Sequence, residues 1–192
     1  MDAYRGYQYP FTILNACAGG TATLTSASPK CNDTLPKIRN NALLFTFDKT
    51  ITAPAPGQVL IQKVLPRGTY GPDLSARFTF TANGNSLTIR ENGVVLNNTE
   101  WYSIRNNGTW PGVANFKRDY AIVYGDANND DYTLYEDVNY ILAFLGNITT
   151  PGTVQDRADI DGNNLINSTD LNVTSNYIAN YKRSKPTGQV CN

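Results

Sequence analysis

The chain has no histidine, and this absence excludes several kinds of active site. Catalysis by a Ser-His-Asp or Cys-His group needs an imidazole, as does any zinc site with histidine ligands. The formal net charge is zero, so no general electrostatic attraction to nucleic acid or to a membrane surface is expected. With 41% hydrophobic residues among 192, the chain can still bury a substantial core.

Long apolar runs are absent as well. No segment reaches the ~18–20 consecutive apolar residues of a membrane span, so we predict no membrane-spanning helix. The opening residues, MDAYRGYQYPF, lack the apolar centre of a signal peptide, so the signal of an exported protein would already have been removed. Asn-x-Ser/Thr sequons support a secreted glycoprotein; they begin at Asn32, Asn97, Asn107, Asn147, Asn167 and Asn172.

Only three cysteines occur, and none forms a Cys-x-x-Cys pair. Cys17 and Cys31 enclose a short segment rich in glycine, serine and threonine. We predict a disulfide between them and an extracellular or cell-surface location. Cys191 is then left free or available to another chain.

Neither the glutamates nor the aromatic residues indicate an active site. Nothing places two of Glu91, Glu100 and Glu136 together as a glycosidase would require, and we predict no enzyme activity. Twelve tyrosines and two tryptophans raise the possibility of carbohydrate binding, but such side chains also fill sheet cores, and we favour that structural role. The candidate sugar-stacking residues are Tyr4, Tyr7, Tyr9, Trp101, Tyr102 and Trp110.

The first two-thirds of the sequence has the pattern of short β-strands separated by turns. The expected strands cover 9–14, 42–47, 58–65, 76–81, 86–90, 100–105 and 119–124. About seven such strands predict a β-sandwich over residues 1–123, with a small barrel as the alternative. The segment YRGYQYPFTIL (4–14) is either the first strand of this domain or a strand donated to a neighbouring subunit.

The charge balance and the spacing of apolar residues change after residue 123. The first part carries twelve basic and seven acidic residues, and the rest carries four basic and nine acidic residues, which suggests a domain boundary. Apolar residues at helical spacing predict helices over 135–146 and 168–181. We predict that residues 183–192 form a C-terminal tail.

Each predicted helix is preceded by an acidic loop, and the two loops repeat. DANNDDYTLYED (126–137) aligns with DIDGNNLINSTD (159–170) at a shift of 33 residues. Oxygen-bearing side chains occupy positions 1, 3, 5 and 12 of both loops. They are Asp126, Asn128, Asp130 and Asp137 in the first loop, and Asp159, Asp161, Asn163 and Asp170 in the second.

This spacing is suited to calcium, which takes six to eight oxygen ligands. Position 7 would supply a backbone carbonyl, from Tyr132 and Leu165, and Asn167 at position 9 can hold a bound water. Position 6 needs a left-handed backbone, which Asp131 and Asn164 tolerate better than most residues. Two such loops, each followed by an amphipathic helix, predict two Ca²⁺ ions.

Residues 124–182 resemble a type I dockerin, a family with two calcium loop–helix motifs that binds cohesin domains. The resemblance lies in YGDANNDD…YEDVNYILAFLG and ADIDGNNLINSTDLNVTSNYIANY. It implies a small all-α domain with two EF-hand-like loops, in which positions 10 and 11 select the partner. These positions are Tyr135 and Glu136 in the first loop, and Ser168 and Thr169 in the second. The first loop departs from the family pattern at Asp131, Thr133 and the Tyr135–Glu136 pair.

Residues 42–123 resemble, more loosely, the bacterial Ig-like modules that precede dockerins, through ALLFTFDKTI and GVVLNNTEWYSI. The predicted fold is therefore a mainly β, Ig-like sandwich followed by an all-α dockerin-like domain. The predicted function is non-catalytic, calcium-dependent and extracellular, with a cohesin-type or other surface protein as partner. The alternative is a self-assembling filament or surface-layer subunit, with calcium-braced interfaces and strand donation.

Overall fold

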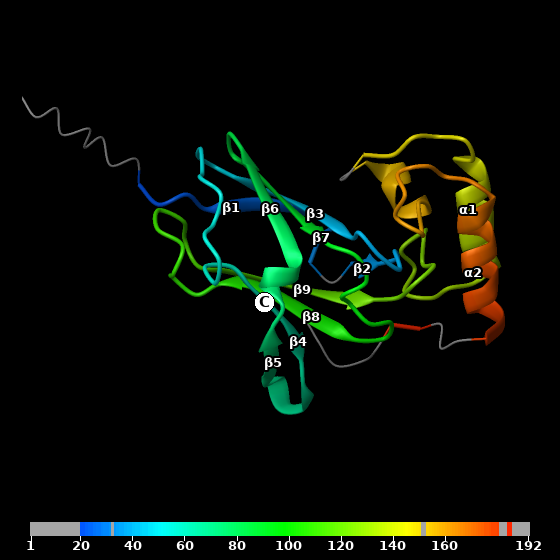
Figure 1. Cartoon of the computed structure of the whole chain (residues 1–192), viewed down its shortest axis with the longest axis horizontal. Coiled ribbons are helices and arrows are strands. Elements are labelled where there is room, and N and C mark those ends of the chain that lie inside the picture. Colours follow the sequence, from blue (N-terminus) through cyan, green and yellow to red (C-terminus); the bar gives the residue numbers. More distant parts are fainter. Residues whose placement is uncertain (1–19, 32, 151–152, 181–183, 186–192) are drawn as a thin grey trace, which may run out of the picture.

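The computed structural model describes residues 20–31, 33–150, 153–180 and 184–185. Within these ranges the chain is mainly β, with nine strands and two short α-helices (Figure 1). The strands are β1 (Leu24–Ser28), β2 (Thr34–Leu35), β3 (Ala42–Phe47), β4 (Leu60–Val64), β5 (Tyr70–Asp73), β6 (Phe78–Asn83), β7 (Ser86–Glu91), β8 (Trp101–Asn106) and β9 (Phe116–Ile122). The helices are α1 (Tyr135–Ala143) and α2 (Ser168–Asn180), and short 3-10 turns η1 (Pro66–Gly68), η2 (Ser75–Arg77) and η3 (Val154–Ala158) connect other elements.

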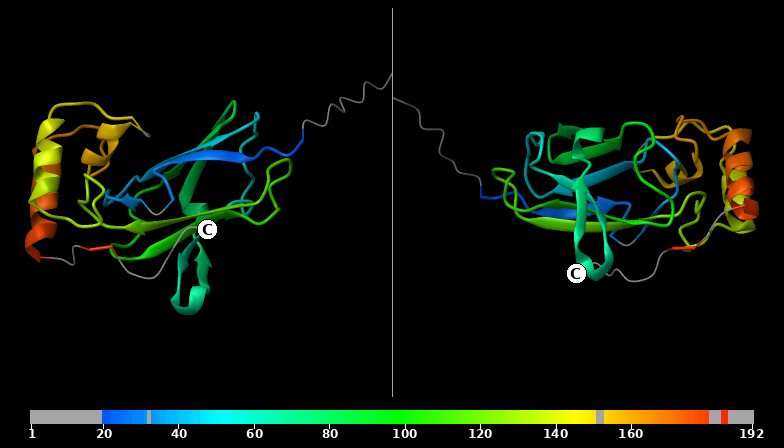
Figure 2. Two further views of the ribbon diagram at one scale, coloured as in Figure 1. Left: turned by 180° about the vertical axis from the view of Figure 1, so that it is seen from behind. Right: turned by 60° about the horizontal axis from the view of Figure 1, so that its bottom comes forward.

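The strands form two sheets that enclose one core. The four-stranded sheet has the order β1-β3-β7-β6, and the five-stranded sheet has the order β2-β9-β8-β4-β5. All neighbours are antiparallel except β2 and β9, which run parallel. The hairpin of β4 and β5 projects from the body of the sandwich (Figures 1 and 2).

Alternation of side chains along the strands builds this core. In β3, Phe45 and Phe47 are buried, while the neighbouring Leu44 and Thr46 are only partly covered. Phe45 packs edge-on against Phe116 of the opposite sheet, with ring centroids 5.6 Å apart. Because successive side chains of a strand point to opposite faces, one set of apolar residues fills the space between the sheets.

Six of the strands expected from the sequence correspond to β3, β4, β6, β7, β8 and β9, with shifted ends in most cases. Strands β6 and β7 form a tight hairpin joined by the two residues Gly84 and Asn85. The segment 9–14 lies outside the described residues. The strands β1, β2 and β5 were missed, because they are short and carry few of the apolar residues on which strand prediction relies.

Both predicted helices are present, and they lie side by side at one end of the sandwich (Figures 1 and 2). The prediction of a small all-α dockerin-like C-terminal domain is nevertheless wrong. Irregular loops make up much of this region, and its own core contains only five buried apolar residues, which are Ala127, Ile141, Ala158, Ile160 and Ile166. So small a core does not sustain an independent domain.

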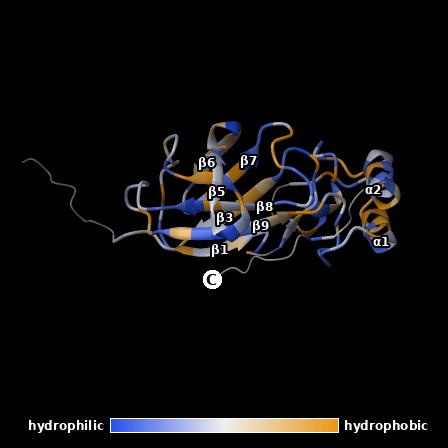
Figure 3. Cartoon of the chain, turned by 90° about the horizontal axis from the view of Figure 1, so that it is seen from below, coloured by the Kyte–Doolittle hydropathy of each residue, from blue (hydrophilic) through white to orange (hydrophobic). Residues whose placement is uncertain are grey.

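The sandwich completes the packing of the helices. Ile38, from the segment after β2, packs against the small core, and the ring of Tyr177 on α2 contacts that of Tyr124 with centroids 5.5 Å apart. Hydrophobic segments run through the strands and recur on both helices (Figure 3). On α1, however, only Ile141 of the predicted apolar face is fully buried, and Leu142 remains exposed together with Leu145 just beyond the helix.

Candidate metal centre

The two loops of the repeat occupy comparable places in the fold, because each ends in the first turn of a helix. The first loop (residues 126–137) follows β9 and ends in the first turn of α1, and the second loop (residues 159–170) follows η3 and ends in the first turn of α2. In each helix, the last aspartate of the loop accepts a hydrogen bond from a backbone N–H that precedes the helix. Each loop is therefore anchored by a helix N-terminus, where a carboxylate is also favoured by the helix dipole.

The loops share a network of side-chain to backbone hydrogen bonds. In the first loop, backbone N–H groups donate from Asn128 to Asp137, from Asp130 to Asp126 and Asn128, from Tyr132 to Asp130, and from Leu134 to Asp137. The second loop repeats all five bonds at a shift of 33 residues, from Asp161 to Asp170, from Asn163 to Asp159 and Asp161, from Leu165 to Asn163, and from Asn167 to Asp170. The sequence repeat is thus a structural repeat.

The backbone dihedral angles repeat in the same way. At position 6, Asp131 has φ 76° and Asn164 has φ 69°, which confirms the predicted left-handed conformation. Position 4 is also left-handed, with φ 66° at Asn129 and φ 71° at Gly162. Asparagine, aspartate and glycine are the residues that adopt this region most readily, which explains why these types occur here.

In the second loop, three predicted ligands converge. Carboxylate oxygens of Asp159, Asp161 and Asp170 all lie within 4.8 Å of one another, and all three residues are buried. Burial raises the pKa of Asp170, and the carboxylates of Asp161 and Asp159 add to this shift. Asn163 donates from its side-chain amide to Asp161 at 3.0 Å. A cation would relieve the repulsion among these carboxylates.

The first loop carries the same ligand types in a looser arrangement. Asp126 and Asp137 are buried, but Asp130 is exposed and accepts a hydrogen bond from the Asn128 amide at 2.9 Å. Burial raises the pKa of Asp137 to about 6, with a further contribution from Asp126 and Asp130. Among the described residues, three acidic side chains converge within such short distances in the second loop alone.

The other predicted ligands have contacts of their own. The Leu165 carbonyl accepts from the Asn167 amide at 3.2 Å, so these two groups of the second loop lie together. Tyr132 pairs with Ser184 and Leu165 with Ile148 in isolated antiparallel bridges. Ile148 and Ser184, which follow α1 and α2 by a few residues, thus each pair with the loop of the other repeat. Coordination by the carbonyls of Tyr132 and Leu165 stays a prediction.

The predicted partner residues lie on the surface at the first turns of the helices. Tyr135 is 72% exposed, and Glu136, Ser168 and Thr169 are exposed as well. These four positions are therefore accessible to another protein. No contact in the structure tests which partner they meet.

Arg157 and Lys37 are basic residues that contact position 1 of the first and the second loop, respectively, and the sequence did not reveal them. Arg157 donates to the backbone carbonyls of Thr34, Asp126 and Ala127, and its guanidinium lies 4.0 Å from the Asp126 carboxylate. Thr34 donates from its hydroxyl to the same carboxylate at 2.5 Å. Lys37 is buried and lies 3.0 Å from Asp159 Oδ2. Arg157 lies 31 positions from Asp126, and Lys37 lies 122 positions from Asp159. No local sequence pattern marks either contact, so proximity in the fold alone shows their role.

Lys37 also contacts a carboxylate outside the loops. Its ammonium lies 2.8 Å from Asp156 Oδ1 on η3, so one buried cation faces two carboxylates. Asp159 uses its other oxygen, Oδ1, to accept from the Asn163 N–H. Lys37 therefore orients the first ligand of the second loop, and it offsets part of the negative charge when no metal is bound.

The segment after β2 binds the second loop through its backbone as well. Ile38 N–H donates to the Ile160 carbonyl at 2.9 Å, and Arg39 Nε donates to the Asp161 carbonyl at 2.6 Å. Gly162 lies so close that an added Cβ would be 2.3 Å from the Arg39 carbonyl oxygen. Glycine is thus required at position 4 of the second loop by packing as well as by its positive φ.

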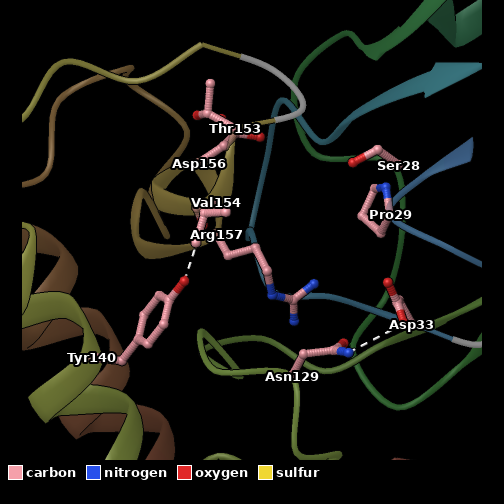
Figure 4. Close-up of a pocket in the computed structure, with 9 residues that line it drawn as sticks. All are labelled: Ser28, Pro29, Asp33, Asn129, Tyr140, Thr153, Val154, Asp156 and Arg157. Carbon is pink, nitrogen blue, oxygen red and sulfur yellow. Dashed lines mark hydrogen bonds between the residues drawn. The ribbon is translucent and has the colours of Figure 1, made fainter.

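A cleft of about 210 Å³ marks the boundary between the sandwich and the C-terminal region (Figure 4). Its walls are Ser28, Pro29 and Asp33 on one side, Asn129 of the first loop, and Tyr140, Thr153, Val154, Asp156 and Arg157 on the other. Asn129 donates to Asp33 at 3.2 Å, and the Tyr140 hydroxyl donates to the Val154 carbonyl at 3.1 Å. The Asn129–Asp33 bond links the first loop to the segment before β2, whereas the Tyr140–Val154 bond lies within the C-terminal region.

The remaining sequence predictions have partial answers. Cys31 is disulfide-bonded, but Cys17 and Cys191 lie outside the described residues, so the pairing of Cys17 with Cys31 stays a prediction. Trp101, Tyr102 and Trp110 are buried, which removes them as sugar-stacking candidates, and Tyr4, Tyr7 and Tyr9 lie outside the described residues. Among the described residues, no helix has the length and apolarity to span a membrane.

In comparisons with known proteins, no family model and no curated protein matches this chain. The likeness to dockerins and to Ig-like modules therefore rests on the residues of this sequence. The geometry of the loops stands independently of that likeness.

Proposed function

We propose that this chain is a non-catalytic, calcium-binding module for protein–protein interaction outside the cell. The proposal of bound calcium is supported by the repeat of five hydrogen bonds in the two loops and by three buried carboxylates that converge in the second loop. Both loops offer only oxygen ligands, which suit a hard cation such as Ca²⁺ and do not favour zinc or copper. Asp126, Asn128, Asp130 and Asp137 would hold one ion, and Asp159, Asp161, Asn163 and Asp170 would hold the other.

Exposed apolar residues support a protein partner for the same region. Seven of the eight large exposed apolar side chains among the described residues lie between positions 132 and 165; they are Tyr132, Tyr135, Leu142, Leu145, Ile148, Val154 and Leu165. Exposed apolar side chains offer contacts to a partner protein, so their concentration in this segment supports a partner here. A cohesin-type domain is the partner that the dockerin resemblance implies, with Tyr135, Glu136, Ser168 and Thr169 as contacts.

The disulfide at Cys31 supports an oxidising setting. Calcium is abundant outside the cell, and a ligand that binds only the folded state raises its stability. The melting temperature should therefore rise when calcium is added to protein treated with a chelator, and magnesium at equal concentration should raise it less. Isothermal titration should give two calcium ions per chain. A melting temperature that is the same with calcium and with chelator would reject the metal proposal.

A second candidate function is self-assembly into an extracellular filament or surface layer. It is favoured by an uncovered sheet edge, which is described below. Light scattering separates the two candidates, because long polymers support assembly and a monomer that captures a cohesin domain supports docking.

A further inference from the structure

The four outer edges of the two sheets differ in how well they are protected. An exposed strand edge offers unpaired N–H and C=O groups, and proteins usually protect it with a short strand, a bulge, a proline or a charge. Strand β2 has only two residues, β1 has an irregular register between Leu24 and Ser26, and β5 contains Pro72 and pairs irregularly with β4.

Strand β6 has none of these protections. It comprises six residues, FTFTAN, with no charge and no proline, and all six pair with β7 in continuous register. Among the described residues, no strand pairs with its outer edge. This edge is therefore regular, uncharged and open.

The direction of its free backbone groups follows from the neighbouring strand. Glu91 N–H donates to the Asn41 carbonyl on the β3 side of β7, so Glu91 and its alternates Ile89 and Leu87 face β3. Their partners on β6 are Phe78, Phe80 and Ala82, which sit at the pairs where β6 and β7 exchange no hydrogen bonds. The backbone N–H and C=O groups of Phe80 and Ala82 consequently point outward.

The core is also incompletely covered at this edge. Phe80, Ala82 and the nearby Leu74 pack against the main core but are only partly buried. A strand added beside β6 would satisfy the outward backbone groups and place its own alternate side chains over these three residues.

We propose that β6 accepts an added strand, and that the occupant is the segment 4–14 of a second copy of this chain. The sequence predicts a strand at 9–14, where Tyr9, Phe11 and Ile13 alternate with Pro10, Thr12 and Leu14. Three apolar residues at every second position match the apolar side of the β6 edge.

The position of the segment along the chain favours a second copy over the same copy. Residues 1–19 join the described structure just before β1, which is the edge of the sheet opposite β6. Donation from the edge of one copy to the opposite edge of the next is a head-to-tail contact, which propagates as an open chain. This inference rests on the second proposed function, self-assembly, and does not depend on calcium.

The test uses two full-length variants that block the two sides of the contact separately. Ala82→Pro removes an outward N–H of β6 while leaving its bonds to β7, and Ile13→Asp places a charge on the apolar face of the donated segment. Wild type should form oligomers whose size grows with concentration in light scattering. Each variant should need at least a tenfold higher concentration to assemble, and Thr81→Ala, which changes a side chain but no N–H, should assemble like wild type.

An equimolar mixture of the two variants gives the decisive result. Ala82→Pro keeps an intact segment 4–14 to donate, and Ile13→Asp keeps an intact β6 edge to accept it. The mixture should therefore form dimers but not polymers. Hydrogen exchange at the amides of Phe80 and Ala82 in wild type should slow on assembly, which tests the same contact without any substitution. Monomeric wild type at all concentrations, variants that assemble like wild type, or unprotected amides in the oligomer would each overturn the proposal. Assembly that persists with chelator, in a chain that binds no calcium, would reject the calcium proposal and leave this one standing.

Discussion

The two loops share one pattern of side-chain to backbone hydrogen bonds and have the same number of carboxylates at positions 1, 3, 5 and 12, yet they arrange these carboxylates differently. The first has the order Asp, Asn, Asp, Asp at positions 1, 3, 5 and 12, and the second has Asp, Asp, Asn, Asp. Exchange of the residues at positions 3 and 5 buries all three carboxylates of the second loop and leaves Asp130 of the first exposed. Bonds from side chains to backbone thus determine the loop conformation, while the order of ligands determines the electrostatics.

The contacts beyond the loops differ in the same way. The first aspartate of the first loop meets the Thr34 hydroxyl, with Arg157 at 4.0 Å. The equivalent Asp159 meets the Lys37 ammonium at 3.0 Å and the Thr149 hydroxyl at 3.2 Å. Both loops therefore pair a hydroxyl and a cation with position 1, but the cation of the second loop is closer. We expect the second loop to be the more ordered site without metal.

The largest effect is expected at position 12. Asp170→Ala removes a buried ligand and the acceptor of two backbone N–H groups, from Asp161 and Asn167. Loss of one partner of a buried charged pair costs about 3–5 kcal/mol, so calcium affinity of the second loop should fall roughly hundredfold or more. Titration calorimetry should then find one ion per chain. Asp137→Ala is the matched change in the first loop, and loss of both ions in either variant would show that the loops are not independent sites.

A smaller loss is expected from Lys37→Met. The substitution leaves Asp156 and Asp159 facing each other without a cation, so the metal-free protein should lose about 3 kcal/mol in free energy of unfolding by urea. Calcium bound beside Asp159 should reduce this loss. Lys63→Met is the control, because the Lys63–Glu100 pair is partly exposed and worth at most about 1 kcal/mol. Equal losses in the two variants would contradict the proposed role of Lys37.

Gly162→Ala should destabilise the protein by roughly 2–3 kcal/mol, because the added Cβ meets the Arg39 carbonyl and the backbone has a positive φ. Gly112→Ala isolates the second cause, since Gly112 has φ 74° but no atom within 4 Å of the added Cβ, and it should cost about 1 kcal/mol. The difference between the two free energies of unfolding measures the contact between the sandwich and the second loop. No difference would mean that this contact yields without cost.

The smallest effect concerns pH in the absence of metal. Burial raises the pKa of Asp137 from 3.8 to about 6, and the pKa values of Asp126 and Asp170 are also raised. A raised pKa means that the folded state binds the proton more tightly, so this contribution to stability is full below pH 4 and is lost as pH rises through 6. The metal-free protein should melt at a higher temperature at pH 5 than at pH 7. Calcium competes with these protons, so saturating calcium should remove or reverse the trend.

Much of the fold could be predicted from local patterns. Alternating apolar residues identified strands such as β3 and β7, and helical spacing identified α1 and α2. The separate all-α domain was predicted wrongly because periodicity indicates helices but does not show how much core they enclose. The core of the C-terminal region contains only five buried apolar residues, and Ile38, from the segment after β2, packs against it.

The repeat of 33 residues, the oxygen-bearing side chains at positions 1, 3, 5 and 12, and the left-handed backbone at positions 131 and 164 all follow from the amino-acid sequence. These properties can be recognised within one loop, or by comparing one loop with the other, without knowledge of the fold. By contrast, the folded chain is needed to see that Thr34 and Lys37 contact the loops, that Gly162 packs against Arg39, and that β6 has an open edge. Such contacts join residues far apart in the chain, and no local pattern encodes them, since they arise when the sheets close around their common core.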